Sequence, residues 1–240
     1  MKTLKGLFLV ITILLVTVSC DIGDSIEGNQ KVKNQKREIS SNFTEIEVSQ
    51  GINVYLTQGP NSSLELELDE NLHDLLITKV ENNILKIYFS EDVGRRRRSI
   101  VHLSMPLITK LTSSSDGEII SQNQLTVQDI TISSSSSGEI DLNIIANKIQ
   151  CKANSSGDIN LIGTADLFIA NASSGSDIEA EKLVSQKVEA KASSGSDIDV
   201  YVAVSLNATA SSGSKIKYWG NPNKLEVDKS SGGKVKKQNP

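Results

Sequence analysis

The chain has 240 residues and a formal net charge of −4, and only 4% of its residues are aromatic. This length allows one or two domains with a buried core, and the mildly acidic balance argues against a nucleic acid partner. Because two histidines and two cysteines show no metal-binding spacing, we predict no metal site and no cofactor.

The N-terminus combines a short basic region with an apolar run over 7–18 that ends in small residues. Such a run is too short to span a membrane and is typical of a secretory signal. Its end resembles the lipobox of bacterial lipoproteins, although Thr17 stands where Leu is usual. We predict a lipoprotein signal peptide over 1–19 and lipid attachment at Cys20. The alternative is an ordinary cleaved signal that leaves Cys20 as a free thiol.

Residues 20–37 are polar, have almost no apolar side chains and lack periodicity. Such a segment buries too little surface to fold, so we predict a flexible tether. With Cys20 assigned to lipid, Cys151 has no partner, and no intramolecular disulfide is expected.

Apolar and polar residues alternate loosely over 43–111, which predicts strands with one buried face. Asn82 and Asn83 separate two such runs. Since both residues tolerate positive φ, they predict a β-hairpin. The Gly-Ile-Asn triplet at 51–53 is interpreted as a bend between two strands in preference to a binding motif.

Four consecutive arginines, Arg95, Arg96, Arg97 and Arg98, lie within this region, after Gly94. A run of this kind is often a solvated loop. Guanidinium groups also bind phosphate and carboxylate well, so contact with anionic glycans or lipid phosphates is the alternative. We retain the four arginines as a candidate binding surface.

The second half of the chain repeats a Ser-Ser-Gly turn followed by a charged residue and an apolar anchor. The anchors recur about every 19 residues, and they are Ile119, Ile140, Ile159, Ile178, Ile198, Ile216 and Val235. Ten residues before the last six anchors stand Ile130, Ile149, Phe168, Val188, Leu206 and Leu225. Apolar residues at every second position on both sides of a turn predict strands with one buried face.

One such unit cannot bury its own apolar face, whereas stacked units form parallel ladders around a continuous core. We therefore predict an all-β fold, a single-stranded parallel β-helix (β-solenoid) of about seven coils with an N-terminal hairpin-bearing β region. Small residues such as Ala190 and Ala208 recur in two columns and predict a narrow corner. Cys151 shares one of these columns and is interpreted as a small core residue.

A column of charged residues stands immediately before the anchors, and it reads Glu118, Glu139, Asp158, Asp177, Asp197, Lys215 and Lys234. Carboxylates stacked in adjacent coils repel one another. We expect splayed side chains, a lysine at one end, or bound cations to offset this repulsion.

The segment Gln50-Gly51-Ile52-Asn53-Val54, together with the Ser-Ser-Gly repeats, resembles the head GIN domain family of autotransporter adhesins, which are common as lipoproteins in Bacteroidota. This resemblance implies one β-helix-like domain on the cell envelope, without an established activity. We predict a single domain over 38–236, a C-terminal tail over 237–240, and an outer membrane lipoprotein that is periplasmic or surface-exposed.

The function expected is non-catalytic binding of a glycan or a surface protein by an adhesin held on the membrane through lipid. The serines recur in turns without a histidine beside them, so nucleophilic catalysis lacks its base. One alternative is a structural or envelope-maintenance role, and another is a carbohydrate-active β-helix enzyme. A sugar-binding site should show exposed aromatic residues or a charged cluster in a groove.

Overall fold

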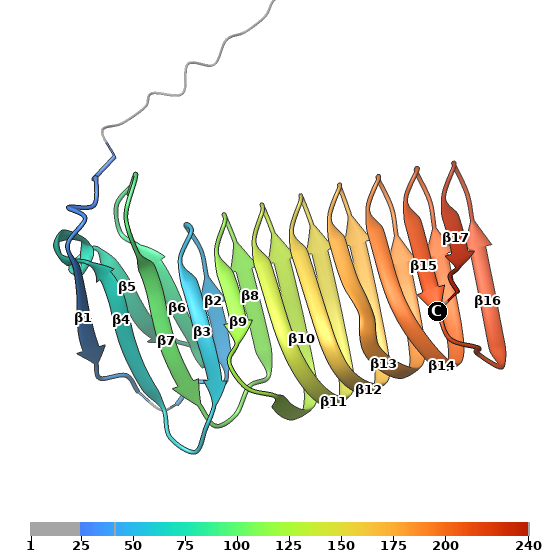
Figure 1. The fold of residues 1–240 in the computed structure, drawn as a ribbon, viewed down its shortest axis with the longest axis horizontal. Coiled ribbons are helices and arrows are strands. Elements are labelled where there is room, and N and C mark those ends of the chain that lie inside the picture. Colours follow the sequence, from blue (N-terminus) through green and yellow to red (C-terminus); the bar gives the residue numbers. More distant parts are fainter. Residues whose placement is uncertain (1–24, 41, 240) are drawn as a thin grey trace, which may run out of the picture.

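The structure, a computed structural model, describes residues 25–40 and 42–239. Seventeen strands belong to one continuous sheet that winds into an elongated solenoid (Figure 1). The predicted β-solenoid of about seven coils is confirmed. Over these described ranges, no helix has the length and apolar character needed to cross a membrane.

Each central coil is one long strand that bends over two faces of the solenoid. The first part of β11 (Glu139–Asn154) pairs with β9 (Glu118–Ser121), and its second part pairs with β10 (Leu125–Ser135). The next coils are β12 (Asp158–Ser173), β13 (Asp177–Ala192) and β14 (Asp197–Ala210). We call the ladder of first parts the front face and the ladder of second parts the back face.

The core lies between these faces, and its register is the one that the repeat predicts. Ile140 pairs with Ile119 on one side and Ile159 on the other, and the column continues to Val235. On the back face, the column that begins at Ile130 continues in the same way to Leu225. Inward side chains of the central coils are buried.

The N-terminal half continues the same two ladders. On the front face, β3 (Asn53–Gln58) pairs in parallel with both β9 and β7 (Ser99–Met105). On the back face, β2 (Glu45–Val48) pairs in parallel with β8 (Lys110–Ser114) and β6 (Ile84–Phe89). The Gly-Ile-Asn triplet lies at the bend between β2 and β3, as predicted.

Antiparallel strands close the N-terminal end. On the front face, β4 (Ser63–Asp69) pairs with β7 and β1 (Val32–Arg37) pairs with β4. On the back face, β5 (Leu76–Glu81) and β6 form the predicted hairpin, and a 3-10 helix, η1 (Glu70–Leu72), joins β4 to β5. Asn82 and Asn83 have φ of 50° and 70°. These elements cover one end of the core, as terminal repeats do in other solenoids.

The prediction of a flexible tether over 20–37 is wrong for its second half. All six residues of β1 pair with β4, and Ile26 forms a bridge with Val93. Main-chain hydrogen bonds hold β1 although its side chains are largely exposed, so a lack of apolar residues did not prevent ordering. The predicted signal peptide and Cys20 lie outside the described residues.

The Ser-Ser-Gly turns are of two kinds. In the later coils, glycines such as Gly195 have φ of 74°, which glycine adopts without steric cost. In earlier coils the preceding serines take positive φ, and Gly157 is needed for a different reason. A Cβ on Gly157 would lie 2.5 Å from the main chain of Ser134 in the neighbouring coil.

In the later turns a further serine follows the glycine and points into the protein. Ser196 is fully buried, and its hydroxyl donates to the carbonyl of Ala172 in the preceding coil at 2.9 Å. The same hydroxyl accepts from the Ser193 main-chain N–H at 3.1 Å. Ser176 and Ser214 make equivalent bonds, so these serines connect successive coils.

The small columns of the repeat are buried as predicted. Ala190, Ala208 and Cys151 are all fully buried and stack in successive coils. Burial raises the pKa of the Cys151 thiol, which keeps it protonated and unreactive at neutral pH. Cys151 is therefore a core residue.

Among the described residues, none forms a comparable cover at the C-terminal end (Figure 1). The last strands are β15 (Lys215–Trp219), β16 (Lys224–Lys229) and β17 (Lys234–Lys237). Leu225 and Val227 continue the inward columns but are 47% and 40% exposed. Since β17 ends at Lys237, the last coil extends one residue into the predicted tail.

We expect Ser196→Ala to destabilise the domain by about 0.5–1.5 kcal/mol, because the change removes two hydrogen bonds of a buried hydroxyl, while the Ser193 N–H and the Ala172 carbonyl keep their bond to each other at 3.0 Å. Ser194→Gly, which changes an exposed residue of the same turn, should alter stability by less than about 0.5 kcal/mol. Denaturant unfolding of both variants measures the difference. Equal midpoints for the two variants would contradict the role given to Ser196.

Candidate binding surfaces

The four arginines of the candidate binding surface occupy the loop between β6 and β7, and all of them line one cavity. This arginine pocket has a volume of about 490 Å³, and its other walls include Gly51, Asn53 and Tyr55. The arginine run and the Gly-Ile-Asn segment, which the sequence analysis treated separately, therefore form one site.

Arg96 holds this site together. Its guanidinium donates to the carbonyls of Gln50 and Gly51 at 2.7 and 2.8 Å and lies 5.2 Å from the centre of the Phe89 ring. Burial lowers its pKa, and the charge of Asp69 opposes this effect. A Cβ on Gly51 would lie 2.5 Å from the Arg96 guanidinium, so the glycine makes room for it.

The other three arginines are exposed, and their positively charged side chains line the pocket. The carboxylate of Glu67 contacts both Arg98 and His102. Its distance is 3.4 Å to Nε of Arg98 and 3.5 Å to Nε2 of His102. Within residues 25–40 and 42–239, Arg95 and Arg97 form no ion pair. The hydroxyl of Ser99, in the pocket wall, is buried without a hydrogen-bond partner. The pocket thus offers donors to an anion.

The predicted acidic column runs along the front face beside this pocket. One ligand atom from each of Glu118, Glu139 and Asp141 lies within 4.8 Å of the others. Burial, and then the charge of Asp141, raises the pKa of both Glu118 and Glu139. Asn53 donates to Glu118 at 2.6 Å. These three carboxylates could approach a cation but supply fewer oxygens than calcium normally takes.

Lysines end the column as expected. Lys215 contacts Asp197 at 2.8 Å, and Lys217 contacts Asp199 in the adjacent column at the same distance. Salt bridges therefore offset the repulsion at the C-terminal end only. In the middle coils the carboxylates face one another without a basic partner in the same columns.

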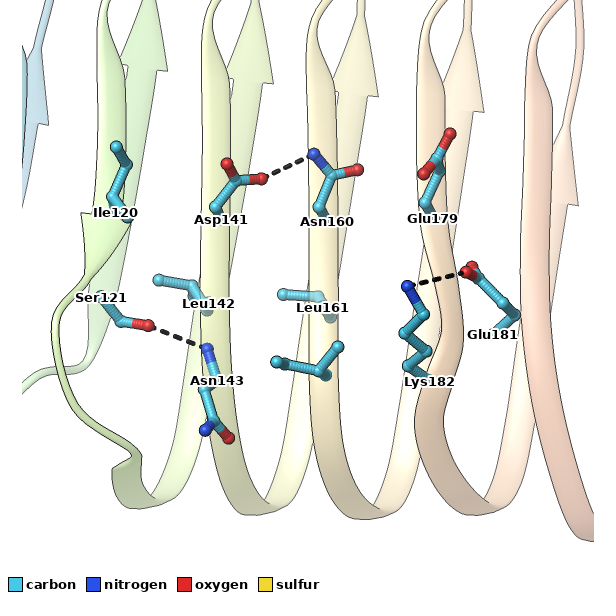
Figure 2. Close-up of a pocket in the computed structure, with 11 residues that line it drawn as sticks. Ile120, Ser121, Asp141, Leu142, Asn143, Asn160, Leu161, Glu179, Glu181 and Lys182 are labelled. Atoms are coloured by element: carbon cyan, nitrogen blue, oxygen red, sulfur yellow. Dashed lines mark hydrogen bonds and ion pairs between the residues drawn. The ribbon is translucent and has the colours of Figure 1, made fainter.

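A groove crosses the front face at the middle coils (Figure 2). It has a volume of about 280 Å³ and is lined by polar groups, among them Asp141, Asn143, Asn160 and Glu179, and by apolar groups that include Ile162. Asn160 donates to Asp141 at 2.6 Å. Ile162 is 44% exposed, so apolar surface is available beside the carboxylates.

The walls of the groove come from differences in coil length. Nine positions separate Ile140 from Ile149 and also Ile159 from Phe168, and these two coils form the floor. On one side of the floor, eleven positions separate Ile119 from Ile130, and the chain leaves the sheet after Ser121 (Figure 2). Ile120 and Ser121 form the first wall there.

On the other side of the floor, ten positions separate Ile178 from Val188. The additional residue forms a bulge, because Asn160 pairs with Glu179 whereas Ile162 pairs with Lys182. Glu181 and Lys182 project there as the second wall and contact each other at 3.9 Å. The groove was not predicted from the sequence, although the unequal spacings between the anchors are visible there.

Neither histidine is arranged as a base for a serine. His73 is 7% exposed, and its ring contacts Gln35 and the carbonyl of Lys33, both at 3.0 Å. It therefore fastens β1 to the domain. His102 lies on the front face, where its ring packs edge-on against Tyr55 with centroids 5.5 Å apart.

The model of a family described as "Putative auto-transporter adhesin, head GIN domain" matches residues 42–222, most of the chain. The chain belongs to the head GIN domain family. This confirms the resemblance drawn from the Gly-Ile-Asn segment and the repeats. A comparison with curated proteins gave no significant match.

Solved structures with this fold come from Bacteroidota-type relatives. A "putative adhesin" from Bacteroides fragilis has a TM-score of 0.82 and 23% identity, covering 89% of this chain and 100% of that one. A "putative lipid binding protein" from Parabacteroides distasonis has a TM-score of 0.76 and 23% identity, and the match covers 90% of this chain and 100% of that one. A "putative adhesin" from Parabacteroides merdae has a TM-score of 0.73 and 20% identity, and the match covers 90% of this chain and 100% of that one. At these identities the likeness concerns the fold of the head GIN domain.

We expect Glu139→Gln to stabilise the domain at pH 7. A carboxyl whose pKa is raised by folding favours the folded state below its unfolded pKa of about 4.3, and this contribution is lost as pH rises through the raised value. The advantage of the variant should therefore shrink as pH falls from 7 to about 4. Thermal melts of the variant and parent over this range measure it.

Glu189→Gln is the matched control, because Glu189 is exposed on the back face. It should have little effect at any pH in the same range. An advantage of Glu139→Gln that grows toward acid would show that the sign of the shift is wrong.

Proposed function

We propose that this head GIN domain protein is an envelope lipoprotein of the adhesin type that binds neutral glycans, without catalysis, in the groove of its front face. Family membership supports a role at the cell surface or envelope. The observation that carries the ligand class is the groove itself, in which a charged and polar cluster adjoins exposed apolar side chains.

The groove chemistry suits sugar hydroxyls. Asp141 and Glu179 offer acceptors, and the amides of Asn143 and Asn160 offer both donors and acceptors. Exposed Ile162 can pack against the C–H face of a sugar ring. Because carboxylates dominate the front face here, an anionic glycan would be repelled, whereas a neutral one would not.

Rigidity also favours binding. The floor consists of strands β11 and β12, which pair with each other in register along the groove, so the polar groups are held before a ligand arrives. No aromatic platform lines the groove as described, so the expected affinity is modest and avidity through many anchored copies would add to it.

An enzyme is the second candidate, because Glu139, whose pKa is raised, lies next to Asp141 at the edge of the groove. Glycoside hydrolases use two neighbouring carboxyl groups, of which the one that acts as general acid has a raised pKa. Release of shortened glycans during binding would favour that function.

We expect glycan-array binding by the full protein to weaken about tenfold when Asp141→Ala or Glu179→Ala removes one charged hydrogen-bond partner. Glu189→Ala, in the same strand as Glu179 but on the back face, is the control and should bind like the parent. Equal loss in all three variants, or no array signal for the parent, would sink the proposal. Mass spectrometry of the array glycans detects cleavage.

We expect lipid at Cys20, following the predicted signal peptide over 1–19. Intact-mass analysis of the protein from bacterial membranes should show the mass of the attached acyl groups, and Cys20→Ala should lose it. The variant should also move from the detergent phase to the aqueous phase on partitioning. A variant that remains in the detergent phase would place the anchor elsewhere in the chain.

A further inference from the structure

The arginine pocket adjoins the segment that leads to the proposed anchor. Ile26 donates its N–H to Asp92 at 2.9 Å and accepts from Gly94 at 3.1 Å, and Gly28 donates to Arg95 at 2.9 Å. The first described residues of the chain are thus bound along the loop that carries the four arginines.

Asp69 joins the N-terminal segment to the arginine loop. It is fully buried, and one oxygen of its carboxylate accepts from the main-chain N–H groups of Gln30 and Arg97, at 3.1 and 3.2 Å. Asn71 adds two bonds, from Asn29 at 2.9 Å and to Glu27 at 2.8 Å. The segment and the arginine loop therefore behave as one rigid unit.

The chain between Cys20 and this unit is short. Ile26 follows Cys20 by six positions, and six fully extended residues reach at most about 22 Å. An acyl chain at Cys20 would thus hold Ile26, which is bonded to the arginine loop, within that distance of the bilayer surface. A tether of the length predicted from the sequence would have allowed much greater separation.

We propose that Arg95, Arg97 and Arg98 bind anionic lipid headgroups, whose phosphate carries a net negative charge, in the membrane that holds the protein. This inference deepens the proposed function and rests on lipid attachment at Cys20. Guanidinium groups bind phosphate through paired N–H donors, and the side chains of these three arginines are exposed at the pocket. Arg96, whose donors are spent on main-chain carbonyls, positions the loop.

This contact would orient the protein. The arginine pocket lies in the N-terminal half of the solenoid, beside β3 and β7, and the later coils extend away from it toward the C-terminal end (Figure 1). With the N-terminal half on the bilayer, the groove formed by β11, β12 and β13 would lie farther along the solenoid and remain open to a glycan.

Hydrogen exchange of the lipidated full protein in vesicles tests the proposal. In phosphatidylglycerol-containing vesicles, amides of the arginine loop should exchange about fivefold more slowly than in pure phosphatidylcholine, the factor that one arginine contributes at an anionic surface. Arg95→Gln/Arg97→Gln/Arg98→Gln should abolish the difference. Lys234→Gln/Lys236→Gln/Lys237→Gln removes equal charge from the opposite end and should preserve it.

Equal exchange in the two vesicle types, or loss of the effect in the lysine control as well, would overturn the proposal. Flotation of the same vesicles separates this outcome from failure of the anchor. Protein that floats with both vesicle types but lacks lipid-dependent protection refutes headgroup binding alone. Protein that floats with neither lacks the lipid at Cys20. A melt of each variant confirms that the exposed substitutions leave the fold intact.

Discussion

Parallel pairing in register between successive coils is the constraint on which the rest of the molecule depends. Because each residue lies above its equivalent in the next coil, one choice of residue is repeated as a column. Columns of Ile bury a continuous core, whereas columns of carboxylates accumulate repulsion of about 0.9 kcal/mol per adjacent pair even in water. The in-register pairing that builds a continuous apolar core therefore also places like charges next to one another on the front face.

Both candidate sites lie where the repetition is interrupted. The groove exists because two coils of equal length lie between a longer coil and a bulged strand. The arginine pocket exists because the chain between β6 and β7 leaves the ladder and returns. Both sites are irregularities held by regular neighbours, which keeps their side chains in fixed positions.

The sequence predicted what depends on periodicity. The anchor columns, the hairpin at Asn82 and the buried state of Cys151 all follow from alternation and turn chemistry, and all are confirmed. The order of β1 was not predictable in this way, since main-chain pairing with β4 leaves little trace in side chains. Unequal coil lengths indicated an irregularity, but which side chains converge there depends on the bend of each coil.

The two ends of the solenoid differ in kind. The N-terminal end is closed by antiparallel strands, whereas the last coil leaves Leu225 and Val227 partly uncovered and its final strand carries three lysines. Each coil contacts mainly its neighbours, so stability should fall toward this end and unfolding should begin there. Like charge on the final strand discourages another chain from adding to it. A coil could therefore be gained or lost at this end during evolution while the arginine loop and groove stay unchanged.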